Sequence, residues 1–312
     1  MNSKKSGALF LSIVCCFIAV ELAISFTPLG DNLSVIALML ISELSFMVPV
    51  AVFFFLSGSS LRECFALNKV SVYVALLCIP YTWMVTPLTA ALNVSTLFFT
   101  QNRATQIFDS LSGAGFFLAA LFAGCIAPVC EELTFRGIIF AGIRKSGSAL
   151  QAIFVSALLF GLFHMNFNQA VYAFALGLFF AAVREVTGSI IPSIICHMTL
   201  NGGSVFAVWL ERDVIMDTEF MEEAAEQALE ASSLAMVLGV FIIAAFIGVA
   251  MALCMLAYIA KKHGSLSRFK AIADERISSR GEVNSVPLIA GSVLAVLFMI
   301  VVAVLENIER AG

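Results

Sequence analysis

The stretch CEELTFRG, residues 130–137, decides how the rest of the chain is interpreted. It places Glu131, Glu132 and Arg136 inside a segment, 111–144, that is otherwise almost entirely apolar. A charged side chain at the centre of a membrane helix costs roughly 3 kcal/mol on insertion scales, so it is seldom there without a role. Helical spacing brings Glu132 and Arg136 onto one face and predicts an ion pair between them. Glu131 lies about 100° further round the helix and need not share that partner.

The composition is that of an all-α, polytopic transmembrane protein. The 312 residues are 61% hydrophobic and only 12% charged, with a mean hydropathy of +1.02. A soluble domain is about half apolar and a quarter charged. The eight cysteines form no CxxC pair, which indicates small membrane-helix residues and not a disulfide framework or a zinc knuckle. The formal net charge of −4 says little about partners, and no nucleic-acid partner is predicted.

Apolar runs of about the length that a bilayer crossing needs recur along the chain. They predict nine membrane spans, with eight as the alternative. Lys4 and Lys5 precede a first run that resembles a signal peptide, but the run is long, carries Glu21 and lacks a small-x-small cleavage site, so it is kept as a span. Pro80 and Pro87 are predicted to break the third span. The predicted spans are 8–28, 33–56, 70–92, 111–144, 148–165, 168–183, 189–210, 234–260 and 287–305.

The loops carry their positive charges very unevenly. With the N-terminus inside, thirteen of the seventeen Lys and Arg residues fall in cytoplasmic loops. Only Arg103, Arg212 and Arg310 fall outside, and Arg136 lies within the membrane. Because Lys and Arg are enriched in cytoplasmic loops, the N-terminus is predicted to be cytoplasmic and the C-terminus external, in a bacterial cytoplasmic membrane.

Three regions follow from this reading. Residues 1–110 hold the first three spans, 111–210 hold a four-span core with the charged motif, and 211–312 hold the last two spans. The acidic insert 217–230 is predicted to be external and to form a solvated helix. The basic loop 261–280 has apolar residues at near-helical spacing. This loop suits either a helix on the anionic inner leaflet or an ordinary positively charged cytoplasmic loop.

Two histidines also lie in apolar spans, where a neutral imidazole still needs hydrogen-bond partners. In FGLFH, Phe160 lies four residues before His164, so its ring can pack on the same helix face as the imidazole. In HMTLN, His197 and Asn201 are four apart, which directs an imidazole and a carboxamide to one point. Together with a Glu-Glu-Arg helix, these groups favour catalysis, proton relay or ion passage over packing.

Prolines lie close to both polar groups. Pro128 comes just before Glu131, and Pro192 comes five residues before His197. Each removes an N–H and loosens the preceding turn. A water-accessible pocket and a simple helix kink are both consistent with this placement.

Counting residues from the cytoplasmic loops places the three groups at different depths. At ~1.5 Å per residue, Glu132 lies about 18 Å in, His164 about 24 Å and His197 about 12 Å. Their convergence on one site therefore requires tilted helices, or a loop at Gly147 that is set below the membrane surface.

Three motifs in this order resemble those of the CAAX protease and bacteriocin-processing (CPBP) family. Members of that family are intramembrane endopeptidases related to the type II CAAX prenyl protease. The resemblance covers about 111–210. The motifs are EExxxR at Glu131, Glu132 and Arg136, FxxxH at Phe160 and His164, and HxxxN at His197 and Asn201.

The resemblance implies proteolysis within the membrane, with Glu131 activating a water for attack on a peptide carbonyl. The substrate would be a membrane protein or peptide, possibly lipidated, and membrane lipid is the other expected partner. The resemblance also implies supporting roles. Glu132 and Arg136 would orient Glu131, and His164 would help to hold the water. His197 and Asn201 would donate hydrogen bonds to the tetrahedral oxyanion.

Two alternatives remain open at this point. Glu131, His164 and His197 could supply three ligands to a zinc ion with water in the fourth position, although the HExxH spacing of soluble zinc proteases is absent. The metal-free mechanism is favoured, so zinc is kept as a possible cofactor only. A proton-coupled transporter or an immunity-type membrane protein is the non-enzymatic alternative. A transporter should show paired broken helices in two related halves, and the sequence shows no such symmetry.

Overall fold

The computed structural model describes residues 2–27, 33–58, 60, 64–97, 115–210, 231–274 and 283–311. Within these ranges every regular element is a helix, as the composition predicts. The acidic insert 217–230 and the end of the basic loop, 275–280, lie outside the described residues.

By length and composition alone, eight described segments qualify as spans, one fewer than predicted. The fifth predicted span is the exception, because α9 (Ala149–Phe163) has only 15 residues. At ~1.5 Å per residue it is about 22 Å long, against a hydrocarbon core of about 30 Å. The ion pair of Arg144 with Glu185 joins residue 144 to the end of the helix Phe167–Thr187, so the short helix between them still runs from one end of the bundle toward the other. The spanning segments are α1 (Ser3–Ser25), α2 (Val35–Ser57), α4 (Val72–Leu97), the composite segment Phe116–Ser146, α10 (Phe167–Thr187), α11 (Ile191–Leu210), α13 (Ala231–His263) and α15 (Val286–Ala311).

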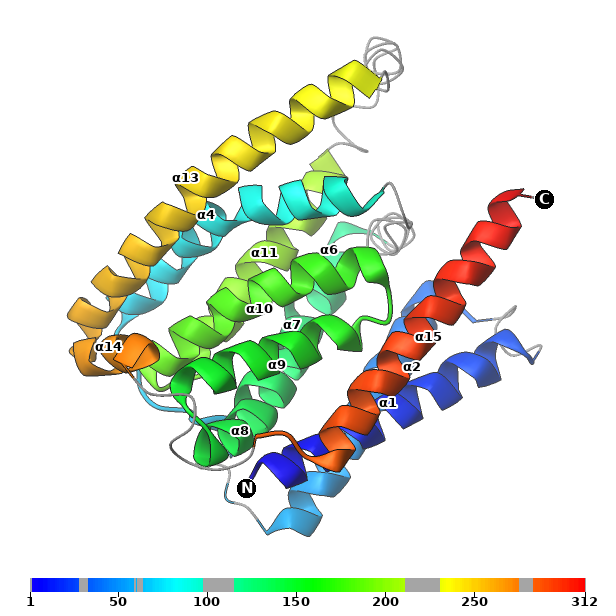
Figure 1. Cartoon of the computed structure of the whole chain (residues 1–312), viewed down its shortest axis with the longest axis horizontal. Coiled ribbons are helices and arrows are strands. Elements are labelled where there is room, and N and C mark those ends of the chain that lie inside the picture. The colour runs from blue at the N-terminus through cyan, green and yellow to red at the C-terminus, as the bar shows by residue number, and fades with distance from the viewer. Residues whose placement is uncertain are drawn as a thin grey trace.

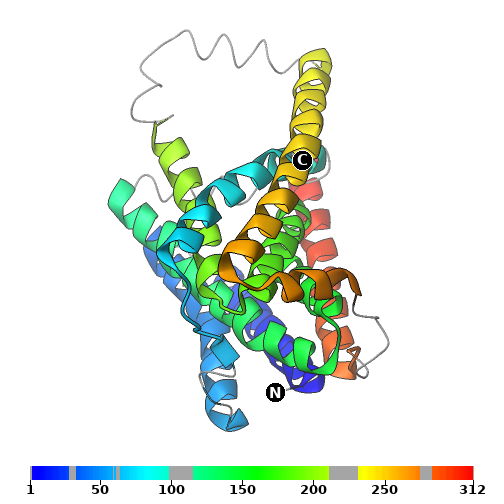
Figure 2. The same ribbon diagram turned by 90° about the vertical axis from the view of Figure 1, so that its left-hand side faces the viewer.

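The helices form a bundle around α10, which packs against α4, α9, α11 and α13. Figure 1 shows α4 and α13 along one flank and α1, α2 and α15 along the other. The flanks have separate apolar cores, one joining α1, α2, α9 and α15 and another joining α4, α10 and α13. The turned view in Figure 2 shows the N-terminus at the lower end of the bundle. The polar motif residues therefore lie in the middle layer, covered on both sides.

Short, strongly capped connections fix the order of the middle layer. Ser148 begins α9 with a capping box, in which its Oγ accepts from the Gln151 N–H and its own N–H donates to Gln151 Oε1. Asn166 is the N-cap residue of α10, and its side-chain oxygen accepts a hydrogen bond from the Gln169 N–H. Gly188 ends α10 at φ +65°, a left-handed conformation that glycine adopts without strain. These caps hold the turns between α9, α10 and α11 tight.

One end of the bundle gathers residues that the charge pattern places in cytoplasmic loops. The backbone N–H of Ser3 donates to Ser146 Oγ at 2.9 Å, which joins the start of α1 to the end of α8 (Phe140–Ser146). Asn68 Nδ2 donates to the carbonyl of Gly188 at 2.7 Å, which brings the segment before α4 to the end of α10. We call this end, which also carries Arg144 and Arg268, the basic end.

The predicted break at Pro80 and Pro87 is wrong. α4 runs without interruption through both prolines. Each proline removes one backbone N–H, but neighbouring helices and polar side chains can satisfy the freed carbonyls in a membrane bundle. The third span is therefore one helix of 26 residues.

Candidate active site

The charged motif lies on a single helical segment that contains two π-helical turns. From Phe116 to Ser146 the chain passes through α6 (Phe116–Leu121), η2 (Phe122–Ile126), α7 (Ala127–Glu132), η3 (Leu133–Ile139) and α8. η2 and η3 are π-helical turns, which are rare and are frequently found at functional sites. Glu131 and Glu132 end the short α-helical stretch between these two π turns.

Glu132 and Arg136 form the ion pair that their spacing predicts. Arg136 Nη1 lies 2.9 Å from Glu132 Oε1, and both side chains are fully buried, at 0% exposure. The guanidinium also lies over the ring of Phe160, 4.2 Å from its centroid. A buried charge pair of this kind needs every available partner, because both ions have lost their hydration. Glu132 is therefore held as a fixed anion.

His197 joins the two glutamates across the helix interface. Its Nδ1 donates to Glu132 Oε1 at 3.0 Å, and its Nε2 lies 3.7 Å from Glu131 Oε2. In the neutral ring, a proton on Nδ1 leaves Nε2 with a lone pair directed toward Glu131. At 3.7 Å, Nε2 and Glu131 Oε2 are too far apart for a direct hydrogen bond, so the two atoms lie close together without being bonded.

Glu131 differs from its neighbour in exposure and in partners. Its side chain is 14% exposed, against 0% for Glu132. The Oε2 atoms of both glutamates are buried and have no hydrogen-bond partner among the described residues, so the contrast lies in the contacts of Glu132 Oε1 with Arg136 and His197. Of the two adjacent carboxylates, Glu132 is held by two partners, whereas the closest partner of Glu131 is His197 Nε2, at 3.7 Å.

His164 ends α9 beside the same aromatic ring. Its Nδ1 donates to the carbonyl of Phe160 at 2.9 Å, and the two rings meet edge to face with centroids 4.9 Å apart. The predicted packing of Phe160 on His164 is thus confirmed. The ring of Phe160 also contacts His197, at 5.7 Å between centroids. The ring of Phe160 therefore contacts both histidines and the guanidinium of Arg136.

Asn201 satisfies a carbonyl that Pro128 leaves without a donor. Its Nδ2 donates to the carbonyl of Ala123 at 3.1 Å. Within the helix, this carbonyl could accept from the N–H four or five residues later. The N–H of Ala127 is already bonded to the carbonyl of Phe122, and Pro128 has no N–H. The second N–H of the Asn201 amide is not needed for this contact and remains a possible donor to a ligand.

The donor set does not form a zinc site as it stands. Among the described residues, no group of three or more His, Cys, Asp and Glu side chains is placed to hold a metal ion. The Nδ1 atoms of His164 and His197 are each engaged by an oxygen acceptor. A three-ligand site from Glu131, His164 and His197 would therefore require these side chains to rearrange.

Two neighbours of the site carry no motif signal. Phe180 of α10 packs against His197 at 5.3 Å and lies 5.5 Å from the Arg136 guanidinium. Glu43 of α2 lies close to Cys130, the residue before the glutamate pair. An isolated Phe in an apolar helix gives no sequence signal. Glu43 is notable as an acid inside a span, but only the structure brings it beside the motif.

The fold and the site define a class: an integral membrane protein of apolar helices that buries a glutamate pair, an arginine and a histidine together. Residues 113–203 match a family described as type II CAAX prenyl endopeptidase Rce1-like. This range contains all three motifs, and over it the chain is similar to that family.

Two curated bacterial proteins are similar to the chain. It is 31% identical over 113 residues to the membrane-embedded CAAX protease MroQ of Staphylococcus aureus (strain USA300), over 34% of this chain. It is 24% identical over 110 residues to the putative membrane peptidase YdiL of Bacillus subtilis (strain 168), over 35% of this chain. The match spans less than half of each relative, 43% in both cases. No solved structure matches the chain.

Proposed function

We propose that this protein is an intramembrane endopeptidase that hydrolyses a peptide bond of a membrane-associated or lipidated protein. The observation that carries the proposal is the division between the two glutamates. Glu132 is fixed by Arg136 and His197 through its Oε1, whereas Glu131 is partly exposed and its closest partner among the described residues is His197 Nε2, at 3.7 Å. The family match and the name of one relative as a protease support the same reaction class.

In the proposed mechanism, Glu131 takes a proton from a water molecule as that water attacks the peptide carbonyl carbon. The carbonyl oxygen becomes an oxyanion and accepts a hydrogen bond from the second amide N–H of Asn201. A donor role for His197 requires a proton on Nε2 in addition to the one that Nδ1 donates to Glu132. Glu131 then delivers its proton to the leaving nitrogen, and the C–N bond breaks. His164 holds the water from the opposite side through Nε2, the ring atom that its bond to Phe160 leaves available. No metal ion is required for these steps, and zinc is the alternative that an experiment must separate.

The reaction class is tested by comparing new protein N-termini in membranes that contain either the wild-type protein or Glu131→Ala. We expect a small set of membrane-associated proteins or peptides to be cut only by the wild-type protein. Terminal labelling and mass spectrometry measure this directly. Identical sets of N-termini at equal protein abundance would count against peptidase activity and would favour the transporter or immunity-type alternative.

The proposed orientation places the basic end in the cytoplasm. The contacts between the start of α1, the end of α8 and the end of α10 gather cationic loops at one end of the bundle, which is the pattern of a cytoplasmic surface. A membrane-impermeant thiol reagent applied from outside should label a single cysteine placed at Glu223 and miss one placed at Lys145, after the native cysteines are replaced. Labelling at Lys145 alone would reverse the orientation.

A further inference from the structure

The end of the π turn η3 leaves a backbone carbonyl without the donor that α-helical winding would give it. This carbonyl belongs to Arg136, a residue with no exposed surface. In an α-helix it would accept from the N–H of Phe140, four residues later. That N–H is bonded to the carbonyls of Phe135 and Gly137 instead. Because a buried carbonyl is rarely left without a donor, the partner of this one is informative.

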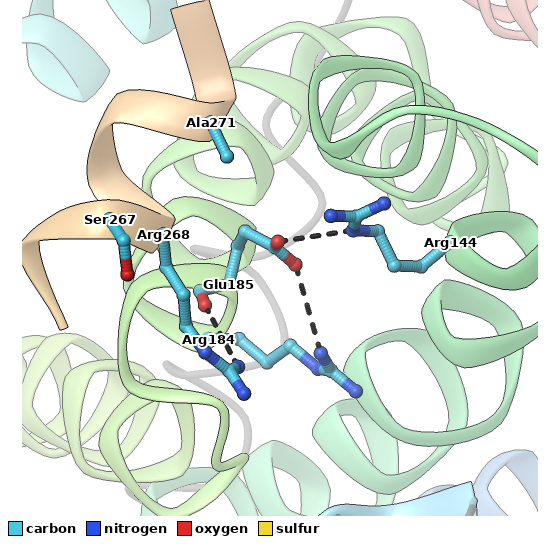
Figure 3. Close-up of a pocket in the computed structure, with 6 residues that line it drawn as sticks. All are labelled: Arg144, Arg184, Glu185, Ser267, Arg268 and Ala271. Carbon is cyan, nitrogen blue, oxygen red and sulfur yellow. Dashed lines mark hydrogen bonds and ion pairs between the residues drawn. The ribbon is translucent and has the colours of Figure 1, made fainter. Parts of the chain in front are cut away.

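A donor comes from Arg184, on the neighbouring helix α10. Its Nε donates to the Arg136 carbonyl at 3.1 Å. Arg184 is itself held in place, because it is only 8% exposed and its guanidinium lies 4.3 Å from the centroid of the Phe140 ring. Figure 3 shows the same guanidinium directed toward the carboxylate of Glu185, with 4.0 Å between Nη1 and Oε2. The Nε thus bonds to the backbone of η3, while Nη1 faces Glu185.

The π winding of η3 determines which way the two glutamates face. A π turn closes over five residues and an α turn over four, so converting η3 to an α-helix would rotate its N-terminal side by about 100° relative to α8. α8 is anchored at the basic end, where the N–H of Ser3 donates to Ser146. Glu131 and Glu132 would therefore turn away from His197, which bonds to Glu132 at 3.0 Å. A side chain that stabilises this π turn also keeps the glutamates in place.

We propose that Arg184 is a positioning residue for the peptidase reaction, a role that rests on the function proposed above. Its Nε–H bond to the Arg136 carbonyl stabilises the π winding of η3 and so holds the glutamate pair against His197. The role needs the N–H at the ε position and not the positive charge. Asn201 donates to the Ala123 carbonyl at the end of η2 in the same way, so each π turn has a side-chain donor from another helix.

Two variants of Arg184 separate the N–H from the charge. Arg184→Met keeps the length of the side chain as far as the ε position but removes the N–H. Arg184→Gln also removes the charge, but it places an amide N–H at the same number of bonds from the backbone. We expect Arg184→Met to lower kcat for peptide cleavage by about tenfold or more with little change in KM, and Arg184→Gln to stay within about threefold of the wild type. Lys270→Met, an exposed change on α14 (Leu266–Asp274), should leave kcat unchanged.

A second readout does not depend on peptidase activity. The chain has three histidines, so isotope-labelled histidine gives three imidazole signals in an NMR spectrum of the protein in detergent. His197→Gln identifies the signal of His197, whose ring N–H reports the bond to Glu132. We expect Arg184→Met to shift this signal and Arg184→Gln to retain it.

Loss of both readouts in Arg184→Met, with both retained in Arg184→Gln, supports the proposal. Equal losses in the two variants would assign the effect to the charge, and unchanged readouts in Arg184→Met would make the glutamates independent of this bond. Either result overturns the proposal. If Arg184→Met does not fold, Arg184→Gln decides alone, because a Gln variant that folds poorly or turns over slowly also overturns it. If the wild-type protein cleaves no peptide, the proposed function fails, while the His197 signal still decides whether Arg184 positions the glutamate pair.

Discussion

Glu131→Gln is expected to lower the rate of peptide cleavage by about 10²–10⁴-fold while the protein still folds. The amide has nearly the same shape as the carboxylate but cannot accept a proton from water. The substitution breaks no short contact, because the closest basic side chain to Glu131 among the described residues is His197, whose Nε2 lies 3.7 Å from Glu131 Oε2. Turnover of a peptide identified in the terminal-labelling experiment measures the rate, and size-exclusion chromatography measures the folded fraction.

The controls for this variant distinguish a loss of catalysis from a loss of folding, and a metal-free mechanism from a zinc-dependent one. Glu306→Gln makes the same chemical change near the end of α15 and should keep full activity. Asn201→Ala should lower turnover by roughly 10²–10³-fold if its amide stabilises the oxyanion. Wild-type activity should persist after chelation, without stoichiometric metal. Zinc at about one ion per chain that tracks activity, or near-normal cleavage by Glu131→Gln, would contradict the glutamate mechanism.

Contacts within one helix could be predicted from the sequence. Glu132 and Arg136 are four apart, and so are Phe160 and His164, and both pairs meet in the structure. The spacing rule holds here because the 3.6-residue period fixes which side chains are neighbours, whatever surrounds the helix. The family resemblance rested on the same local patterns, and the match to residues 113–203 confirms it.

Contacts between helices could not be predicted in this way. Counting residues placed Glu132 and His197 at different depths, yet His197 bonds to Glu132 at 3.0 Å. Depth counting assumes straight α-helices along the membrane normal. The motif segment contains two π turns, which change both its rise and its direction. The partner of Asn201 depends on the same irregularity, because the carbonyl of Ala123 needs a donor only where the regular ladder fails.

The span count shows a related limit. The apolar run 148–165 has the composition of a membrane span, but its helix ends at Phe163, before His164 and the bend at Met165. A capped start at Ser148 and an early end leave it too short to cross alone. Composition reports how apolar a segment is, whereas helix length depends on polar residues at its two ends.

Arg136→Ala is expected to lower the free energy of unfolding by about 3–5 kcal/mol, the typical result of stranding one member of a buried ion pair. Glu132 would keep its charge at 0% exposure without the guanidinium, and Phe160 would lose its cation contact. The temperature at which the protein loses its size-exclusion peak in detergent measures the effect.

Lys145→Ala, an exposed change on the same composite helix, should shift that temperature little. The double variant Glu132→Gln with Arg136→Met should recover most of the loss, because Gln still accepts from His197 and no unpaired charge remains. If Arg136→Ala and Lys145→Ala lose their size-exclusion peaks at the same temperature, the ion pair does not stabilise the fold, and its burial must serve the chemistry of Glu131 instead.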